Sequence, residues 1–98
     1  MDEEKVLGVV ARVVRKGKHG PYAISYAKNS AIREALVTFS LAVPCWVEST
    51  IPERGVLVVL TDITKKRAGW RAGSARYVRV ADAEFVAEHE GGRSHGDI

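Results

Sequence analysis

Hydrophobic and polar residues alternate with a period of two along much of the chain, as expected for β-strands that bury one face. Residues 36–43 show this pattern most clearly. Their odd-numbered positions, from Val37 to Val43, are predicted to face the core. Thr38 and Ser40 are predicted to face the opposite way. The alternation favours a strand over a helix in this segment.

Alternation, β-branched residues and continuous apolar runs together predict five strands, separated by segments rich in Gly, Pro and charged residues. They comprise residues 6–15, 22–27, 36–43, 56–63 and 70–80. The last strand is predicted to bend at Gly73. Val78 and Val80 are predicted to face inward and Tyr77 outward. Five short strands with turns at this spacing are typical of a small barrel, so the prediction is an all-β, five-stranded Greek-key barrel.

The segment after the last strand has a helix-compatible composition, in which Phe85, Val86 and His89 would form a short stripe that caps the barrel. The final residues are polar and contain glycine, which is typical of disorder. The predicted organisation is an acidic N-terminal extension at residues 1–4, a barrel at residues 5–80, a short C-terminal helix at residues 81–90 and a disordered tail at residues 91–98.

Positive charge is concentrated in the body of the chain. The span from Lys5 to Val80 holds 14 of the 15 Lys and Arg residues and only four of the 12 acidic ones, so its net charge is +10. The two ends together carry −7. A basic body attracts nucleic acid through counterion release, and acidic ends can compete for the same surface. A basic surface that is merely solvated is the alternative explanation.

The basic residues gather in two predicted loops. The denser cluster contains Lys65, Lys66, Arg67 and Arg71, and the second contains Arg12, Arg15, Lys16 and Lys18. In five-stranded Greek-key barrels, the loop joining the first two strands and the loop joining the last two flank the ligand-binding face. The position of both clusters therefore favours a polyanion-binding face.

Aromatic residues lie beside these cations. Tyr22 and Tyr26 share one face of a predicted strand, and Trp70 follows a Lys-Lys-Arg segment. Flat aromatic rings can stack on the bases of a single strand, although each ring can also serve ordinary packing. Phe39 and Trp46 are predicted to lie in the core. The candidate nucleic-acid-binding residues are Arg12, Lys16, Lys18, His19, Tyr22, Tyr26, Lys65, Lys66, Arg67, Trp70, Arg71, Arg76 and Tyr77.

Part of this pattern resembles a known family. The matching segments are residues 8–10, 16–24, 55–60 and 66–69, with Ala75 and Val78. The first two are similar to the opening hairpin of cold-shock-type OB-fold proteins, in which a Gly-x-Val strand precedes a Lys-Gly motif rich in aromatic residues. The resemblance implies an OB-fold, a base-stacking role for Tyr22 and nucleic-acid backbone contacts for Lys16 and Lys18.

Catalysis has little support in the sequence. The three histidines lie in unrelated segments, no residues have metal-ligand spacing, and no phosphate-binding GxxxxGK[ST] motif is present. Cys45, the single cysteine, lies in an apolar stretch and is predicted to be a buried, unreactive thiol. We therefore expect no enzymatic activity, cofactor or metal.

No segment reaches the roughly 20 apolar residues that cross a bilayer. The acidic start Met1-Asp2-Glu3-Glu4 also differs from a signal peptide. We expect a cytoplasmic protein that binds single-stranded DNA or RNA by stacking and phosphate contacts, with little sequence specificity. Two alternatives stay open: a protein-interaction or assembly module, including a homo-oligomer, and an accessory factor that recognises structured RNA.

Overall fold

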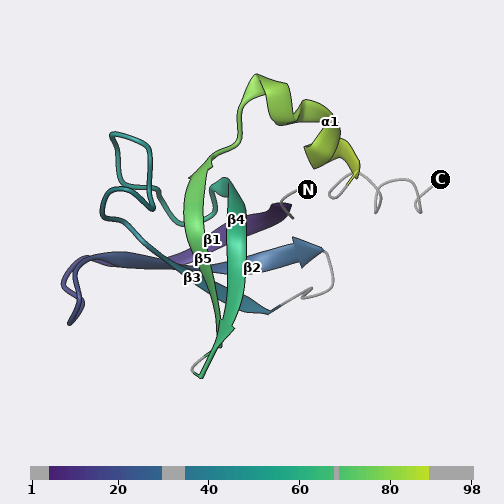
Figure 1. Ribbon diagram of the computed structural model, residues 1–98. Helices are drawn as coiled ribbons and strands as arrows, with labels where there is room; N and C mark the ends of the chain where they lie inside the picture. The colour runs from purple at the N-terminus through teal and green to yellow at the C-terminus, as the bar shows by residue number, and fades with distance from the viewer. Residues whose placement is uncertain (1–4, 30–34, 68, 89–98) are drawn as a thin grey trace.

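The computed structural model of the protein describes residues 5–29, 35–67 and 69–88. The strands are β1 (Lys5–Val14), β2 (Tyr22–Asn29), β3 (Leu36–Ser40), β4 (Leu57–Lys66) and β5 (Gly69–Tyr77), followed by the 3-10 helix η1 (Val80–Asp82) and the helix α1 (Ala83–Val86). The strands form a closed barrel in the order β1-β2-β3-β5-β4 (Figure 1). The five-stranded barrel and the short C-terminal helix predicted from the sequence are confirmed. The predicted extension, the predicted tail and His89 lie outside the described residues.

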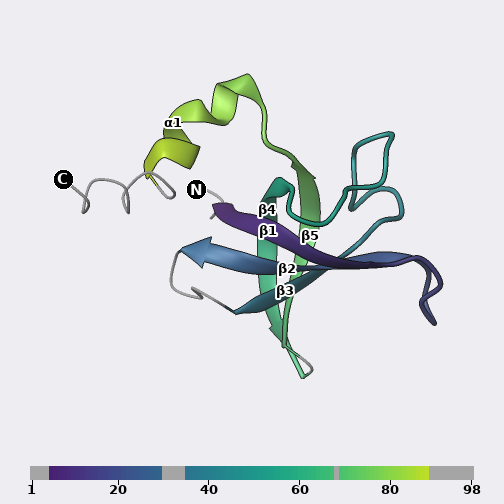
Figure 2. The same cartoon turned by 180° about the vertical axis from the view of Figure 1, so that it is seen from behind.

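Two long-range pairings close the barrel. β1 pairs antiparallel with both β2 and β4, whereas β3 pairs parallel with β5. In Figures 1 and 2, β1, β2 and β3 run across β4 and β5, and α1 lies on the side opposite the β1–β2 connection. Closure leaves no open sheet edge between the strands, because each strand has a partner on both sides.

Small residues on the inner face of β2 leave room for larger ones from other strands. Ala23, Ser25 and Ala27 are buried, and Phe39 and Leu60 fill the interior around them. The Ser25 hydroxyl donates a hydrogen bond of 2.8 Å to the Val37 carbonyl, so this buried polar group is satisfied. The alternating pattern of β2 is therefore confirmed, with the face that carries Tyr22 and Tyr26 on the outside.

A local distortion where Asp62 of β4 faces Gly73 of β5 changes which residues of β5 face the core. Asp62 has a φ of 58°, and its side chain lies against Gly73 on the neighbouring strand, where any Cβ would collide with its carboxylate. Both Ala72 and Ala75 are buried, so the inward face shifts by one residue at Gly73. Tyr77 consequently packs against the core. The outward orientation predicted for Tyr77 is wrong for this reason.

The inward orientation predicted for Val80 is also wrong. Val80 is 94% exposed, whereas Val78 is half-buried. The ladder with β4 ends at Tyr77, and the chain then turns into η1. Beyond that point the alternation of a strand no longer determines the direction of a side chain.

β3 is shorter than predicted. It ends at Ser40, whose hydroxyl accepts a hydrogen bond from the amide of Ala42. A turn follows, in which the amide of Cys45 donates to the Ala42 carbonyl. Val43 is therefore 86% exposed and not buried as predicted, and Leu41 is half-buried against the core.

The connection after β3 returns to the barrel through Trp46, which is buried as predicted. Its ring stacks on Phe39 at 5.6 Å and meets Tyr77 edge-on at 5.0 Å between ring centroids. Its indole nitrogen donates a hydrogen bond of 2.8 Å to the Thr50 carbonyl. Cys45 is half-buried, and burial raises the pKa of its thiol, which lies 3.6 Å from the Ala72 carbonyl.

Asp82 fastens the C-terminal segment to the barrel. Its carboxylate accepts two hydrogen bonds from the Arg76 guanidinium, at 2.7 and 3.0 Å, and a third from the backbone amide of Arg79 at 2.8 Å. The hydrogen bonds from Arg76 are the main cause that lowers the pKa of Asp82 to about 2. Asp82 is almost fully buried, so the pairing is shielded from solvent.

Replacing Asp82 with asparagine is expected to reduce the free energy of unfolding by about 1–2 kcal/mol at neutral pH. The folded-state pKa of Asp82 lies below its ordinary value of 3.8, so the ionised carboxylate stabilises the fold above that pH. This contribution is lost as the pH falls from about 4 to about 2. Urea unfolding of both proteins across this range, followed by circular dichroism, measures the effect. Glu84→Gln, at an exposed acid of α1, is the control. If the difference in free energy of unfolding between the parent and D82N is the same at about pH 2 as at neutral pH, the prediction is wrong.

Candidate nucleic-acid interface

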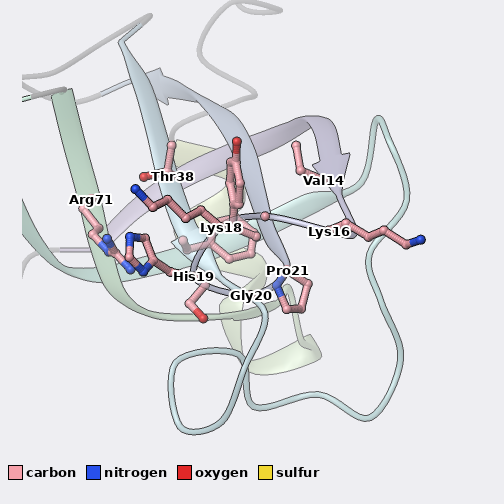
Figure 3. A pocket seen from close by; sticks show the side chains of 12 residues that line it. Val14, Lys16, Lys18, His19, Gly20, Pro21, Thr38 and Arg71 are labelled. Atoms are coloured by element: carbon pink, nitrogen blue, oxygen red, sulfur yellow. The ribbon is translucent and has the colours of Figure 1, made fainter.

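A cleft of about 500 Å³ opens on the outer surface beside the β1–β2 connection. Its lining comprises residues 14, 16–22, 38–40 and 71. We call it the basic cleft. Figure 3 shows Lys18, His19 and Arg71 gathered on one side of it, with Thr38 behind them, whereas Lys16 points the other way. The cleft thus combines the β1–β2 connection with side chains of β3 and β5.

Strand pairing brings these segments together. Tyr22 of β2 pairs with Ser40 of β3, and Thr38 of β3 pairs with Arg71 of β5. Residues that lie opposite each other in a ladder share a face of the sheet. Arg71 therefore reaches the cleft from the last strand because β5 lies beside β3, although Arg71 and Thr38 are far apart in the sequence.

The β1–β2 connection is held close to Tyr22. The amide of Gly20 donates a hydrogen bond of 3.1 Å to the Gly17 carbonyl. A Cβ at Gly17 would approach the Tyr22 ring to 2.9 Å and collide with the carbonyl of Gly20. Only glycine allows the chain this close, so the tight turn sets the distance between the basic connection and the aromatic ring.

The cleft is electropositive. Lys16, Lys18 and Arg71 line it, and no acidic side chain of the described residues does. The ion pairs Arg76–Asp82 and Arg79–Glu48 involve residues that do not line the cleft. Positive side chains gathered around a concave surface without counter-charges create a field that attracts anions.

The denser predicted cluster lies, apart from Arg71, on the β4–β5 hairpin, which projects from the bottom of the barrel in both Figure 1 and Figure 2. Lys65, Lys66 and Arg67 are exposed there, but none of them lines the basic cleft. Trp70 is half-buried against the core, with the Lys65 ammonium 5.0 Å from its ring centroid. The ring of Trp70 is thus already in contact with a cation and with the core.

Of the remaining predicted site residues, two lie on the outer face near the cleft and two lie away from it. Arg12 is exposed and pairs with Ile24, on the outer face close to the cleft. Tyr26 is 50% exposed on the same face of β2 as Tyr22. Arg76 and Tyr77 do not line the cleft, because the first pairs with Asp82 and the second packs on Trp46.

Sequence reasoning missed Thr38 and Ser40 as parts of the site. The alternation along residues 36–43 already placed both on the outer face of their strand, which was the available signal. Their position beside Tyr22 follows from the β2–β3 ladder, which the local pattern does not specify.

The described residues contain no group of three or more His, Cys, Asp or Glu side chains that could hold a metal ion. Within the same part of the chain, no helix has the length and hydropathy to span a bilayer. Comparison of the chain with protein-family models, with curated proteins and with solved structures finds no match.

Proposed function

We propose that this protein is an OB-fold module that binds single-stranded nucleic acid at the basic cleft, with little sequence specificity. The observation that carries the proposal is the composition of the cleft: three cationic side chains and the Tyr22 ring on its wall, with no carboxylate among the residues that the structure describes there. Single-strand binders need this pairing of a cationic track for phosphates with aromatic surfaces for bases.

The position of the cleft supports the proposal. In OB-folds, nucleic acid binds on the face of the second and third strands, beside the loop between the first two. The basic cleft lies at this place, between β2, β3 and the β1–β2 connection. The proposal extends to either DNA or RNA in the cytoplasm.

Limited base readout follows from the hydroxyl groups near the cleft. The Thr38 hydroxyl lies 3.5 Å from the Trp70 carbonyl, and the Ser40 hydroxyl accepts a hydrogen bond from the Ala42 amide. Among the described residues, no Asn or Gln, the side chains that commonly read adenine, lines the cleft. Stacking and phosphate contacts tolerate any base.

A protein-interaction module is the second candidate, and one observation favours it. The β3–β4 connection exposes apolar side chains, with Val43 86%, Val47 53% and Ile51 41% exposed. Exposed apolar patches often mark protein contacts. Trp46 of the same connection is buried and therefore cannot itself dock a partner. Association that does not weaken with salt, in the absence of nucleic acid, would favour this candidate.

The proposal predicts measurable binding to unstructured oligonucleotides. Fluorescence anisotropy with labelled oligo-dT and oligo-U of about 15 nucleotides should show affinity that falls about 20-fold between about 50 and 200 mM salt, if three phosphate contacts form. Tyr22→Leu should weaken binding about tenfold, because leucine retains apolar volume but offers no ring for stacking.

Tyr22→Phe is the matched control, because it retains the ring and should bind within about twofold of the parent. An RNA hairpin of equal length tests the structured-RNA alternative, which predicts tighter binding to the hairpin than to oligo-U. If neither oligonucleotide binds at low salt, the proposed function is wrong.

A further inference from the structure

The polar side chains of the basic cleft are concentrated at one place instead of being spread along it. Lys18 and His19 come from the β1–β2 connection, Thr38 from β3 and Arg71 from β5. Figure 3 shows the ends of these four side chains gathered on one side of the cleft, whereas Lys16 points away from them. We call these four residues the donor cluster.

The donor cluster is available to a ligand. Lys18, His19 and Arg71 are exposed, and within the part of the chain that the structure describes neither Lys18 nor Arg71 forms an ion pair. The contact of the Thr38 hydroxyl with the Trp70 carbonyl is long, at 3.5 Å. A hydrogen bond of this length is weak, so the hydroxyl is able to donate to an anion instead.

The donors match a terminal phosphate better than an internal one. An internal phosphodiester has one negative charge and two oxygens outside its ester bonds. A terminal phosphomonoester carries close to two charges above its second pKa of about 6, and it has three such oxygens. Arginine binds two oxygens with its planar fork, lysine adds a point charge, and an imidazole donates at least one N–H in either protonation state. Donors gathered at one point therefore favour the more highly charged group.

The size of the cleft also favours the end of a strand. Its volume of about 500 Å³ lies in the range of pockets that enclose one small ligand, so it accommodates about one nucleotide. The Tyr22 ring is part of the same wall. The Gly17–Gly20 hydrogen bond of 3.1 Å holds the β1–β2 connection, and with it Lys18 and His19, beside that ring. A phosphate site and a stacking surface thus lie within one nucleotide-sized space.

From this arrangement we infer that the basic cleft recognises the end of a strand, with a terminal phosphate bound by the donor cluster and the terminal base stacked on Tyr22. The inference rests on the proposed function and narrows its substrate class to strands that carry a phosphate at the 5′ or the 3′ end. On a strand with hydroxyl ends, the donor cluster contacts an internal phosphate and forms fewer hydrogen bonds. Neither contact depends on the identity of the base.

Short oligonucleotides with different ends test the inference. Tetra-U with a 5′-phosphate, with a 3′-phosphate and with two hydroxyl ends would each compete against labelled oligo-U at about pH 7.5 and about 100 mM salt. At least one phosphorylated form should bind about tenfold more tightly than the hydroxyl form, and it identifies the end that is bound. Hexa-U with hydroxyl ends has the same total charge as phosphorylated tetra-U and should gain less than about threefold.

Substitutions locate the phosphate through the ratio of the two affinities, for phosphorylated and hydroxyl-ended tetra-U. Lys18→Ala and Arg71→Ala should each reduce this ratio from about tenfold to about threefold or less. Lys16→Ala is the matched control: it removes the same charge from the same connection, but its side chain points away from the donor cluster (Figure 3). It should weaken both forms alike and leave the ratio near tenfold.

The outcomes separate the inference from the proposed function. Equal affinity for all forms of tetra-U, an equal gain for hexa-U, or a ratio that persists in both K18A and R71A would overturn the inference. So would binding of the parent to oligo-U of about 15 nucleotides without binding to phosphorylated tetra-U, because a site for a strand end must hold a short strand. The proposed function would stand in each of these cases. Failure of the parent to bind any of these strands would instead overturn the proposed function.

Discussion

Reversing two charges in the basic cleft, with Lys18→Glu and Arg71→Glu together, is expected to weaken binding of oligo-U on the order of 100-fold at about 50 mM salt. Both side chains line the cleft and point to the same side of it (Figure 3). Each substitution removes a phosphate contact and adds repulsion. For the parent, a plot of the logarithm of the binding constant against the logarithm of the salt concentration should have a slope of about −2. For the double variant the slope should be shallower than about −1, since each phosphate contact contributes about −0.7 for a single strand.

The single variants Lys18→Glu and Arg54→Glu form a matched pair. Each changes the net charge by the same amount at an exposed position, but Arg54 lies on the β3–β4 connection and does not line the cleft. At about 150 mM salt, K18E should bind about tenfold more weakly and R54E within about twofold of the parent, because screening removes distant effects. Equal losses would show that net charge, and not the cleft, determines affinity.

Replacing Trp46 with alanine is expected to reduce the free energy of unfolding by about 3–5 kcal/mol, which is a large part of the 5–15 kcal/mol typical of a domain. The side chain is 3% exposed and packs between Phe39 and Tyr77. Its removal leaves a cavity at the centre of this contact. It also leaves the Thr50 carbonyl without the hydrogen bond from the indole nitrogen.

Urea unfolding followed by far-ultraviolet circular dichroism measures this loss without relying on tryptophan fluorescence. Val43→Ala, on the same connection but 86% exposed, is the control and should change stability by less than about 0.5 kcal/mol. Trp46→Phe retains a ring and should lose less than the alanine variant. A loss below about 1 kcal/mol for W46A would mean that Trp46 is not part of the core in solution.

These predictions separate two groups of residues. Trp46, Tyr77 and the Arg76–Asp82 pair hold the β3–β4 connection and the C-terminal segment in place. The basic cleft contains none of these residues. Substitutions in the first group should therefore change stability, and substitutions in the cleft should change binding with the fold intact. This division makes the two classes of experiment independent tests.

The sequence by itself determined the features that depend on local pattern. Period-two alternation identified the strands at residues 22–27 and 36–43, because a strand must place successive side chains on opposite faces. β-branched and continuous apolar residues identified those at 6–15 and 56–63. Alternation also placed Phe39 inside, and Tyr22 and Tyr26 on a shared face. The density of Lys and Arg around residues 12–18 and 65–71 marked the two basic segments, since charge is read directly from composition.

Only the tertiary structure decided which of these features lie together. The paired distortion at Asp62 and Gly73 shifts the inward face of β5, which turns Tyr77 to the core against the simple alternation. The parallel pairing of β3 with β5 brings Arg71 to Thr38 and so completes the basic cleft. The ion pair with Asp82 occupies Arg76. Each outcome depends on contacts between residues distant in the sequence, and local propensity carries no information about such contacts.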